Sequence, residues 1–376
     1  MLVKKNILFI DIEGGWGGSS RSLYFIIKSL DREKYNPVIV YKKDGPNKDR
    51  YSGLGVKTYL IRDLFSFAPR EKNSAKIFFA NIKDLFLFIP RLQEILGIIS
   101  YEKIDIVHLN YEGLFLFAKY LKMITKLPVV CHSRTLIPIN FWGRKISNIL
   151  NKYVDEILFI SHNEKDRFHD LTNSSRGLIM WNMAEITANY SPYRNKLKRI
   201  IFLGNIDYTK GVDRLIELGK ELKKKKINNV LIEIYGAARS ETKYIKSLIN
   251  KVSCLNLSGY ISFKGHTAEP EKILDRAYVL IRPSRSNDPW GRDVIESVCK
   301  GIPVIATGSY EGVVKDRYNG FLIPSYSHKE MLNKLMLLLD GEVSRDVLSK
   351  NCLSSAKKKF GGNAQKLILE KVYGRT

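Results

Sequence analysis

The chain contains few cysteines and no long uninterrupted apolar run. Its four cysteines stand far apart, without the short spacing of a zinc site or a redox motif. No segment reaches the roughly 18 uninterrupted apolar residues that a membrane-spanning helix requires. The apolar start of the chain runs into Asp11 and Glu13 without the small-residue cleavage site of a signal peptide. We therefore expect a cytoplasmic protein with reduced thiols and no membrane-spanning helix.

Acidic residues are also scarce relative to basic ones. There are 62 Lys and Arg against 38 Asp and Glu, which gives a formal net charge of +24. Such an excess calls for an anionic partner, and nucleic acid, anionic lipid and nucleotide-type substrates all fit the charge alone. The basic residues are spread along the chain, which favours a membrane surface or small anions over nucleic-acid grooves. No RNA- or DNA-binding motif is present, so we expect no nucleic-acid partner.

At 376 residues the chain is longer than one hydrophobic core usually grows, so two domains are expected. Apolar runs alternate with helical periodicity in both halves, which predicts two doubly wound α/β domains with parallel sheets. We expect domains at 1–190 and 191–356, with a C-terminal helix at about 357–376 that packs back on the first. The expected strands are 6–12, 37–41, 104–109, 128–131 and 156–160, then 199–203, 230–235, 261–264, 278–281 and 303–306.

A glycine-rich loop, Gly14 to Ser20, joins the first strand to the first helix. Glycines allow close backbone approach to a ligand, and the N–H groups at a helix start attract anions. The loop lacks the last glycine of a dinucleotide fingerprint and the lysine of a P-loop. A tight turn without ligand contact remains the alternative at this loop.

Two further segments carry polar groups at strand ends in the second half. Gly204 to Asp213 places the Lys210 ammonium beside a helix start, a suitable cradle for a diphosphate. The segment 282–307 presents two carboxylates, Asp288 and Glu296, between two apolar strands, where α/β sheets bind ligands. A solvated surface lysine and solvated helix carboxylates explain the same residues equally well when each is taken alone.

Three histidines, His108, His132 and His162, lie at or just beyond strand ends of the first half. If the strand before His132 ends where its apolar run ends, the imidazole faces the cleft between the domains. A structural histidine is the alternative at each position.

Together and in this order, the segments resemble the retaining GT-B glycosyltransferases of family 4, over nearly the whole chain. The resemblance is strongest from Ile200 to Pro324. It rests on the Gly-Gly pair, the strand-end histidine, the Ser and Asn segments before the second domain, the Lys-Gly phosphate loop and the block with two carboxylates. In this sequence these are Gly17-Gly18, His132, Ser161, Asn182, Gly204-Asn205, Lys210-Gly211, Pro283-Ser284, Asp288, Glu296 and 301–307.

The resemblance implies two Rossmann-like domains that face each other across a cleft, and transfer of a sugar from a nucleoside diphosphate sugar with retention. It implies a catalytic set of Asp288, Glu296, His132 and Lys210. Glu296 would hold the donor ribose, Asp288 the donor-sugar hydroxyls, and His132 would approach the transferred sugar. Donor binding would involve Gly17, Gly18, Gly204, Asn205, Lys210, Arg285, Trp290, Gly291 and Glu296.

Two positions depart from the family pattern. Asn205 replaces an arginine that shares the diphosphate with lysine, and Asp288 replaces a glutamate. The positive field at the leaving group then comes from Lys210, with Arg282, Arg285 or Arg292 as further candidates. A catalytically degenerate carbohydrate-binding or regulatory subunit is the alternative that these departures motivate.

No Asp-x-Asp occurs in the chain, so the resemblance implies a reaction without a metal or other cofactor. The acceptor would be a glycan or a lipid-linked glycan, as in bacterial surface polysaccharide, lipopolysaccharide or glycolipid assembly. Residues 64–99 and 136–142 combine Phe, Leu and Ile with Lys and Arg. This pattern predicts peripheral binding to the inner face of the cytoplasmic membrane, and ordinary core packing is the alternative.

Overall fold

A computed structural model describes residues 4–67, 78–80, 82–168, 177–187, 189–237 and 242–375. The chain forms two compact units. Unit 1 comprises Met1–Met183 and Gly362–Thr376, and unit 2 comprises Ala184–Gly361. The predicted boundaries fell after residues 190 and 356, and the structure divides the chain after residues 183 and 361.

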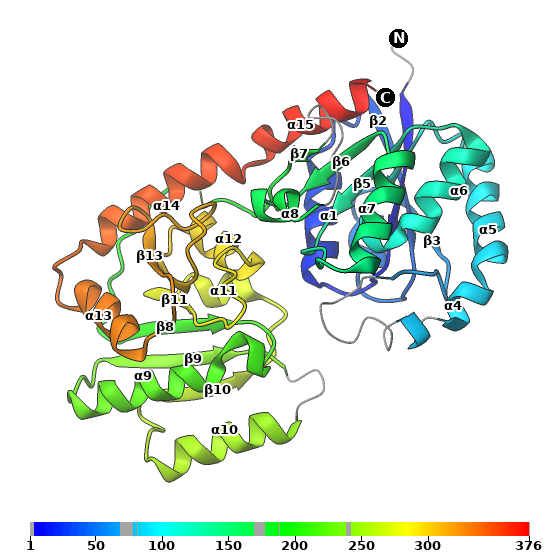
Figure 1. Ribbon diagram of the computed structural model, residues 1–376. Helices are drawn as coiled ribbons and strands as arrows, with labels where there is room; N and C mark the ends of the chain where they lie inside the picture. The colour runs from blue at the N-terminus through cyan, green and yellow to red at the C-terminus, as the bar shows by residue number, and fades with distance from the viewer. Residues whose placement is uncertain are drawn as a thin grey trace. The chain divides into compact units, whose positions relative to one another are not determined.

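The described part of unit 1 contains a seven-stranded parallel sheet in the order β3-β2-β1-β4-β5-β6-β7 (Figure 1). Strands β1 and β4, which are not consecutive in the chain, lie side by side near its centre, and the winding direction reverses between them. The strands are β1 (Lys5–Asp11), β2 (Tyr35–Tyr41), β3 (Lys57–Leu60), β4 (Ile106–Leu109), β5 (Val129–Ser133), β6 (Glu156–Phe159) and β7 (Leu178–Ile179).

Helices cover both faces of this sheet because its strands are apolar on both sides. Leu8 and Ile10 of β1 belong to a core with α5, α6 and α7, whereas Ile7 and Phe9 belong to a core with α1 and α15. The helices are α1 (Gly18–Ser29), α2 (Asn47–Ser52), α4 (Ile82–Phe86), α5 (Phe88–Tyr101), η1 (Glu112–Leu114), α6 (Phe115–Thr125), α7 (Phe141–Tyr153), α8 (His162–Asp166) and α15 (Gly362–Arg375).

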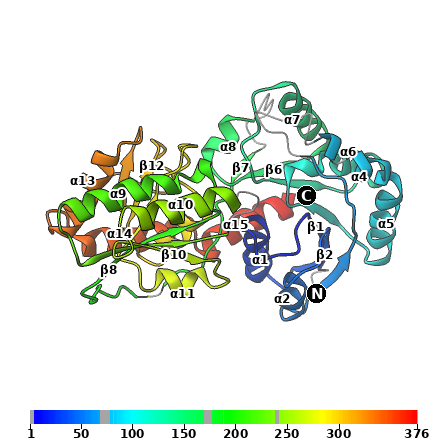
Figure 2. The same cartoon turned by 90° about the horizontal axis from the view of Figure 1, so that it is seen from below.

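The C-terminal helix α15 belongs to unit 1 and lies beside α1 (Figure 2). Its Tyr373 is buried, and the hydroxyl lies 2.6 Å from Nδ1 of His108 on β4. The chain therefore returns to unit 1 with α15, after it has formed unit 2.

Unit 2 contains, in its described residues, a six-stranded parallel sheet in the order β10-β9-β8-β11-β12-β13. The winding direction reverses between β8 and β11. The strands are β8 (Lys198–Leu203), β9 (Val230–Tyr235), β10 (Ile261–Gly265), β11 (Val279–Arg282), β12 (Val304–Thr307) and β13 (Gly320–Ile323).

One face of this sheet forms a core with α9, α10 and α13. Among the other helices, α12 packs against α11 and α14. The helices are η2 (Tyr208–Lys210), α9 (Val212–Lys224), α10 (Thr242–Cys254), α11 (Pro270–Leu274), α12 (Arg292–Cys299), α13 (His328–Leu339) and α14 (Arg345–Lys359). Because β8 and β11 are parallel neighbours, the loops that follow them lie together at the carboxyl ends of the strands.

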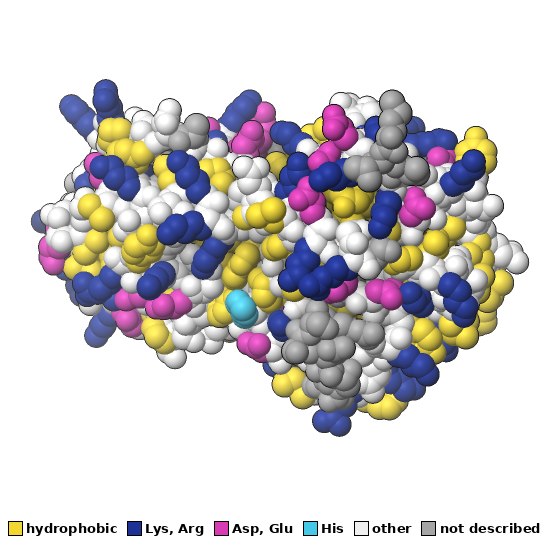
Figure 3. All heavy atoms as spheres, turned by 90° about the horizontal axis from the view of Figure 1, so that it is seen from above, with side chains coloured by type: hydrophobic (Ala, Val, Ile, Leu, Met, Phe, Trp, Pro, Cys, Tyr) yellow, Lys and Arg dark blue, Asp and Glu magenta, His cyan; other side chains and the backbone are white. Residues whose placement is uncertain are grey.

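Across the described part of the chain, no helix combines the length and apolar character needed to span a bilayer. On the face shown in Figure 3, Lys and Arg side chains are distributed among apolar and acidic ones. The large positive charge is therefore spread over this face, as the sequence suggested.

Candidate active site

The carboxyl ends of β8 and β11 are the expected ligand-binding edge of unit 2, because open α/β sheets bind ligands where the strand order reverses. The loop after β8 carries Lys210, and the loop after β11 carries Asp288. The fold thus brings together two residues that are far apart in sequence and that were both predicted to act on the donor.

The loop after β8 is pinned in place by close backbone contacts. Gly204 has a φ of 154°, and a Cβ on the neighbouring Gly236 would lie 1.8 Å from the Gly204 carbonyl oxygen. The Asp207 side chain caps η2 by accepting a hydrogen bond from the Lys210 N–H at 2.9 Å. Gly211 has a φ of 71°, and a Cβ there would lie 2.0 Å from the Pro283 oxygen. Lys210 therefore sits on a loop that is held firmly against the end of β11.

Lys210, Asp288 and Arg282 form a charged array beside the start of α9. Lys210 Nζ lies 3.3 Å from Asp288 Oδ2, and Arg282 Nη2 lies 2.5 Å from the same oxygen. Arg282 also donates from Nε to the Asp288 carbonyl oxygen at 2.6 Å. Burial opposes ionisation of Asp288, but the charges of Arg282 and Lys210 outweigh it and hold its pKa below the ordinary value. The array is thus a carboxylate shared by two cations.

Arg282 is the buried centre of this array, with 7% of its side chain exposed. Its Nη1 contacts both carboxylate oxygens of Asp293, at 2.6 and 2.8 Å, in the first turn of α12. Burial disfavours the charged form, yet Asp293 and Asp288 together raise its pKa above the ordinary value. A Cβ on Gly291 would lie 2.4 Å from this Nη1, so glycine at this predicted donor residue makes room for the Arg282–Asp293 pair.

Arg285 ties the two loops together. Its guanidinium contacts both carboxylate oxygens of Asp213 at 2.6 and 2.8 Å and donates to the Tyr208 carbonyl oxygen at 2.6 Å. The guanidinium also lies over the Tyr208 ring, 3.7 Å from its centroid. Arg285 was predicted to bind the donor, and in the structure its guanidinium is engaged within the protein and positions the Lys210 loop.

Glu296 and Trp290 lie on and just before α12. Glu296 is buried and pairs with Arg292 one helical turn earlier, with 2.8 Å between Oε1 and Nε. Trp290 packs edge-on against Tyr310, with 5.1 Å between ring centroids. Asn205 follows Gly204 on the pinned loop, and its side chain carries no charge to the site. Both Glu296 and Asp288 therefore arise from the β11–α12 segment that the sequence singled out.

The glycine-rich loop of unit 1 also lies where the strand order reverses, after β1. Gly17 and Gly18 are exposed at the start of α1, and a Cβ on Gly17 would meet no atom within 4 Å. By contrast, a Cβ on Gly14 would lie 1.9 Å from the Lys43 oxygen. Gly14 thus serves the tight turn, and the helix start at Gly17 and Gly18 is open to a ligand.

His132 does not lie at a strand end, because β5 continues through Ser133. Its side chain is 1% exposed and packs beside His108, with 6.0 Å between ring centroids. Burial and then the charge of Arg134 lower the pKa of His132 well below its ordinary value, so the imidazole is neutral. The strand therefore does not end with its apolar run, which was the condition for the imidazole to face the cleft, and a part for His132 in catalysis stays a prediction.

The polar group presented at the end of β5 is Arg134, which the sequence analysis did not select. Arg134 donates from Nη2 to Asn110 Oδ1 at 2.6 Å and from Nη1 to Asn182 Oδ1 at 2.8 Å. Asn110 in turn donates to Asp11, and burial raises the pKa of Asp11. The available signal was that Asp11 and Asn110 directly follow apolar strand runs, whereas Arg134 stands three residues beyond one, after His132 and Ser133.

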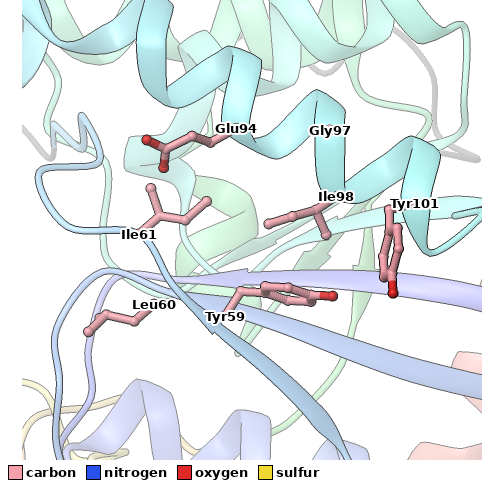
Figure 4. A pocket seen from close by; sticks show the side chains of 7 residues that line it. All are labelled: Tyr59, Leu60, Ile61, Glu94, Gly97, Ile98 and Tyr101. Atoms are coloured by element: carbon pink, nitrogen blue, oxygen red, sulfur yellow. The ribbon is translucent and has the colours of Figure 1, made fainter.

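Outside the charged array, the part of the chain that the structure describes also contains an apolar groove. It has a volume of about 390 Å³ and lies between β3 and α5, with Tyr59 and Ile98 on opposite sides (Figure 4). No cluster of three or more His, Cys, Asp or Glu side chains is placed to hold a metal ion there or elsewhere in the described residues. The charged array of unit 2 is therefore the best candidate for chemistry.

Comparison with protein families assigns one family to each half of the chain. The family described as Glycosyltransferase Family 4 matches residues 16–179, and the family described as Glycosyl transferases group 1 matches residues 186–354. The poly(ribitol-phosphate) alpha-N-acetylglucosaminyltransferase of Staphylococcus aureus is 31% identical over 166 residues, which are 43% of this chain and 30% of that protein. An uncharacterized glycosyltransferase of Methanocaldococcus jannaschii is 24% identical over 69% of this chain and 71% of its own length.

Solved structures share the fold over nearly the whole chain. HepE of Anabaena in complex with UDP matches with a TM-score of 0.79 and 17% identity, over 99% of this chain and all of that one. TarM of Staphylococcus aureus, solved with Fondaparinux, alpha-GlcNAc-glycerol and UDP, matches with a TM-score of 0.73 and 14% identity, over 98% and 99%. The two parallel-sheet units therefore have the GT-B architecture, as the sequence predicted.

Proposed function

The chain is a glycosyltransferase of the GT-B type, composed of a family 4 domain followed by a group 1 domain, and from this premise we propose the reaction that it catalyses. It transfers a sugar from a nucleoside diphosphate sugar to an acceptor hydroxyl, with retention at the anomeric carbon and without a metal ion. The acceptor is a glycan or lipid-linked glycan of bacterial surface polysaccharide or glycolipid assembly.

The observation that carries the donor assignment is the array of Lys210, Arg282 and Asp288 at the reversal point of unit 2. A diphosphate leaving group develops negative charge, and fixed cations beside a helix start stabilise it. Lys210 shares its carboxylate with Arg282, so it can turn toward a phosphate while Arg282 continues to neutralise Asp288. HepE and TarM were each solved with UDP, and we propose a uridine diphosphate donor for this chain.

Glu296 and Asp288 would then have separate tasks. Glu296 is buried on α12, three residues after the Asp293 that contacts Arg282, and would accept hydrogen bonds from the ribose hydroxyls. Asp288 would order the loop through Arg282 and face the donor sugar with its second oxygen. Substitution of Glu296 should therefore lower the affinity for the donor, and substitution of Asp288 should lower turnover.

A panel of UDP- and GDP-sugars with glycan and lipid-linked acceptors tests the reaction. We expect release of UDP, an α-linked product from an α-linked donor by NMR, and unchanged turnover after treatment with EDTA. The matched control is a Lys210→Gln, Glu296→Gln double variant that should release no UDP. Failure of the native chain to release nucleotide from any donor, despite UDP raising its melting temperature, would favour the degenerate binding subunit.

An exposed apolar stripe on unit 1 supports a membrane-bound acceptor. Phe79, Ile82, Phe86 and Ile89 follow one another at helical spacing and are all exposed, Phe86 to 80%. Exposed apolar residues in such a row usually mark a protein or membrane contact. We call these four residues the α4 stripe.

The stripe continues onto the first turn of α7. Phe78, next to Phe79, stacks on Trp142 with 5.1 Å between ring centroids, and the neighbouring Phe141 is 63% exposed. Lys145 lies 4.8 Å from the Phe141 ring centroid, and Lys83 directly follows Ile82 on α4. Aromatic side chains with lysines beside them suit the interface of an anionic bilayer. The groove of Figure 4 lies along α5, the helix that carries Ile89, and offers further apolar cover to a hydrocarbon chain.

Flotation with vesicles that contain anionic lipid tests the membrane contact. We expect the full chain to float at low salt, and a Phe86→Ser, Ile89→Ser double variant to float several-fold less. Leu367→Ser is the matched control, because Leu367 is also an exposed apolar residue of unit 1 but lies on α15. Equal flotation of the double variant and the native chain, or none by either, would remove the membrane from the proposal and leave the donor chemistry intact.

A further inference from the structure

A polar cavity lies in unit 2 at the amino ends of β11 and β12, at the opposite end of these strands from the donor array. Its volume is about 320 Å³, and Ala277 and Ile302, which precede β11 and β12, contribute to its wall. Arg345, the first residue of α14, also lines it. Because the donor array lies at the carboxyl ends of the same strands, the cavity is separate from it. We call this cavity the α14 pocket.

Arg345 is a buried cation whose charge is incompletely matched. Its side chain is 8% exposed, and it donates from Nε to the Tyr278 oxygen at 2.9 Å and from Nη2 to the Ala277 oxygen at 3.3 Å. Its Nη1 is buried and has no hydrogen-bond acceptor, since Oδ1 of Asp346 lies 3.9 Å away. A buried charge that lacks an acceptor is costly, so the site favours an anion that would supply one.

Other positive groups surround the same space. Arg345 occupies the first turn of α14, where the helix dipole is itself positive and favours an acidic residue. Lys300 lines the pocket and pairs with Asp275 at 2.7 Å, whereas Arg194 lines it without a carboxylate partner among the described residues. With Asp275 offset by Lys300, the pocket keeps the charge of Arg194, the field of the helix and an Arg345 charge that Asp346 offsets only in part at 3.9 Å.

The remaining wall suits a hydroxylated molecule. The rings of Tyr190 and Tyr193 and the polar side chains of Ser191 and Asn195 line the pocket. Burial and then the Asp346 carboxylate raise the pKa of Tyr190 to about 12, so its hydroxyl remains a hydrogen-bond donor. Aromatic rings with amide and hydroxyl groups beside them match a sugar or other polyol, and the volume falls at the lower end of the range of small-ligand sites.

We propose that the α14 pocket binds a small phosphorylated polyol, such as a sugar phosphate, with the phosphate at Arg345 and Arg194 and the polyol against the tyrosines. The site does not depend on the transfer reaction, because it shares no residue with the donor array. A concave site of about 320 Å³ also favours a free small molecule over a polymer or a lipid headgroup.

Titration calorimetry on the full chain tests the proposal. UDP is present at saturation, so that binding of the titrated ligand at the donor site contributes no heat. Glucose 6-phosphate, inorganic phosphate and vesicles of anionic lipid are titrated separately. We expect glucose 6-phosphate to bind saturably and inorganic phosphate to bind more weakly. Any binding of vesicles should not depend on Arg345. Arg345→Gln should weaken glucose 6-phosphate binding about tenfold or more, and Arg345→Lys should restore part of it.

Arg194→Gln provides a second variant, because Arg194 is exposed and its substitution leaves the buried contacts of α14 intact. It should weaken binding several-fold, whereas Lys196→Gln, an exposed neighbour outside the pocket wall, should not. The proposal is overturned if glucose 6-phosphate does not bind the UDP-saturated chain, or binds it no better than inorganic phosphate. It is overturned equally if the Arg194 and Lys196 variants bind alike.

Discussion

Replacement of Lys210 by glutamine is the most direct test of the charged array. The substitution removes the only ammonium that contacts Asp288 in the described structure and keeps an amide of similar length. In an active site, loss of one preorganised group that stabilises the leaving charge lowers kcat by about 10²- to 10³-fold. Because Lys210 sits at the reversal point of unit 2, on the loop pinned by Gly211, we expect a loss in this range in kcat/KM.

Stability should change far less than activity. The Lys210–Asp288 pair is partly exposed on both sides, so its loss should cost about 1 kcal/mol or less. Arg282 continues to neutralise Asp288, which leaves no unpaired buried charge. The assay is steady-state release of UDP beside a urea titration of the same preparation.

Lys220→Gln is the matched control, because Lys220 forms a similar pair with Glu217 at 2.8 Å on the exposed part of α9. It should show native kcat/KM and a comparable small loss of stability. If Lys210→Gln keeps kcat/KM within threefold of the native value, the array does not stabilise the leaving group. A large fall in both activity and stability would instead mean that Lys210 acts by holding the loop.

Three further predictions concern donor affinity, loop packing and acid stability. Glu296→Gln should raise KM for the nucleotide sugar about tenfold with little change in kcat, and an unchanged KM in steady-state assays would contradict the ribose assignment. Gly211→Ala should destabilise unit 2 by about 1 to 2 kcal/mol more than Gly265→Ala in urea titrations. Both glycines have positive φ, but only the Cβ at position 211 collides with the Pro283 oxygen. Because His132 is held neutral in the fold and binds a proton when unfolded, stability should fall as the pH drops below about 6.5. His132→Gln should remove up to about 1.4 kcal/mol per pH unit from that slope, and equal slopes would show that His132 is protonated in the folded state.

The central strands of both sheets could be predicted from the sequence, because buried parallel strands are continuous apolar runs. Strand β9 begins and ends where its pattern does, at Val230 and Tyr235. The edge strands β3 and β7 could not be predicted in this way. β3 reads Lys-Thr-Tyr-Leu and is partly exposed, and β7 has only two residues, so neither carries an apolar run. Their existence depends on pairing with a neighbour already in place.

The candidate site also contains some residues that could be predicted from the sequence and others that could not. Lys210 and Asp288 were found because each follows an apolar strand in a loop with glycine or proline, and their contact follows from the strand order. The burial of His132 could not be predicted, because backbone pairing with β6 extends β5 beyond its apolar residues. The central place of Arg282 was equally hidden, since an arginine that ends a strand can face solvent or, as here, two carboxylates.

The two departures from the family pattern are linked through this arginine. With Asn205 uncharged, the positive field at the loop depends on Lys210 and Arg282, and both contact one oxygen of Asp288. The short side chain of Asp288 allows Arg282 to contact its carboxylate and its backbone carbonyl oxygen together. A glutamate would carry the carboxylate about one bond length farther from the backbone and separate these two contacts. We therefore propose that aspartate at position 288 keeps Arg282 at the site and leaves Lys210 as the cation that is available to the leaving group.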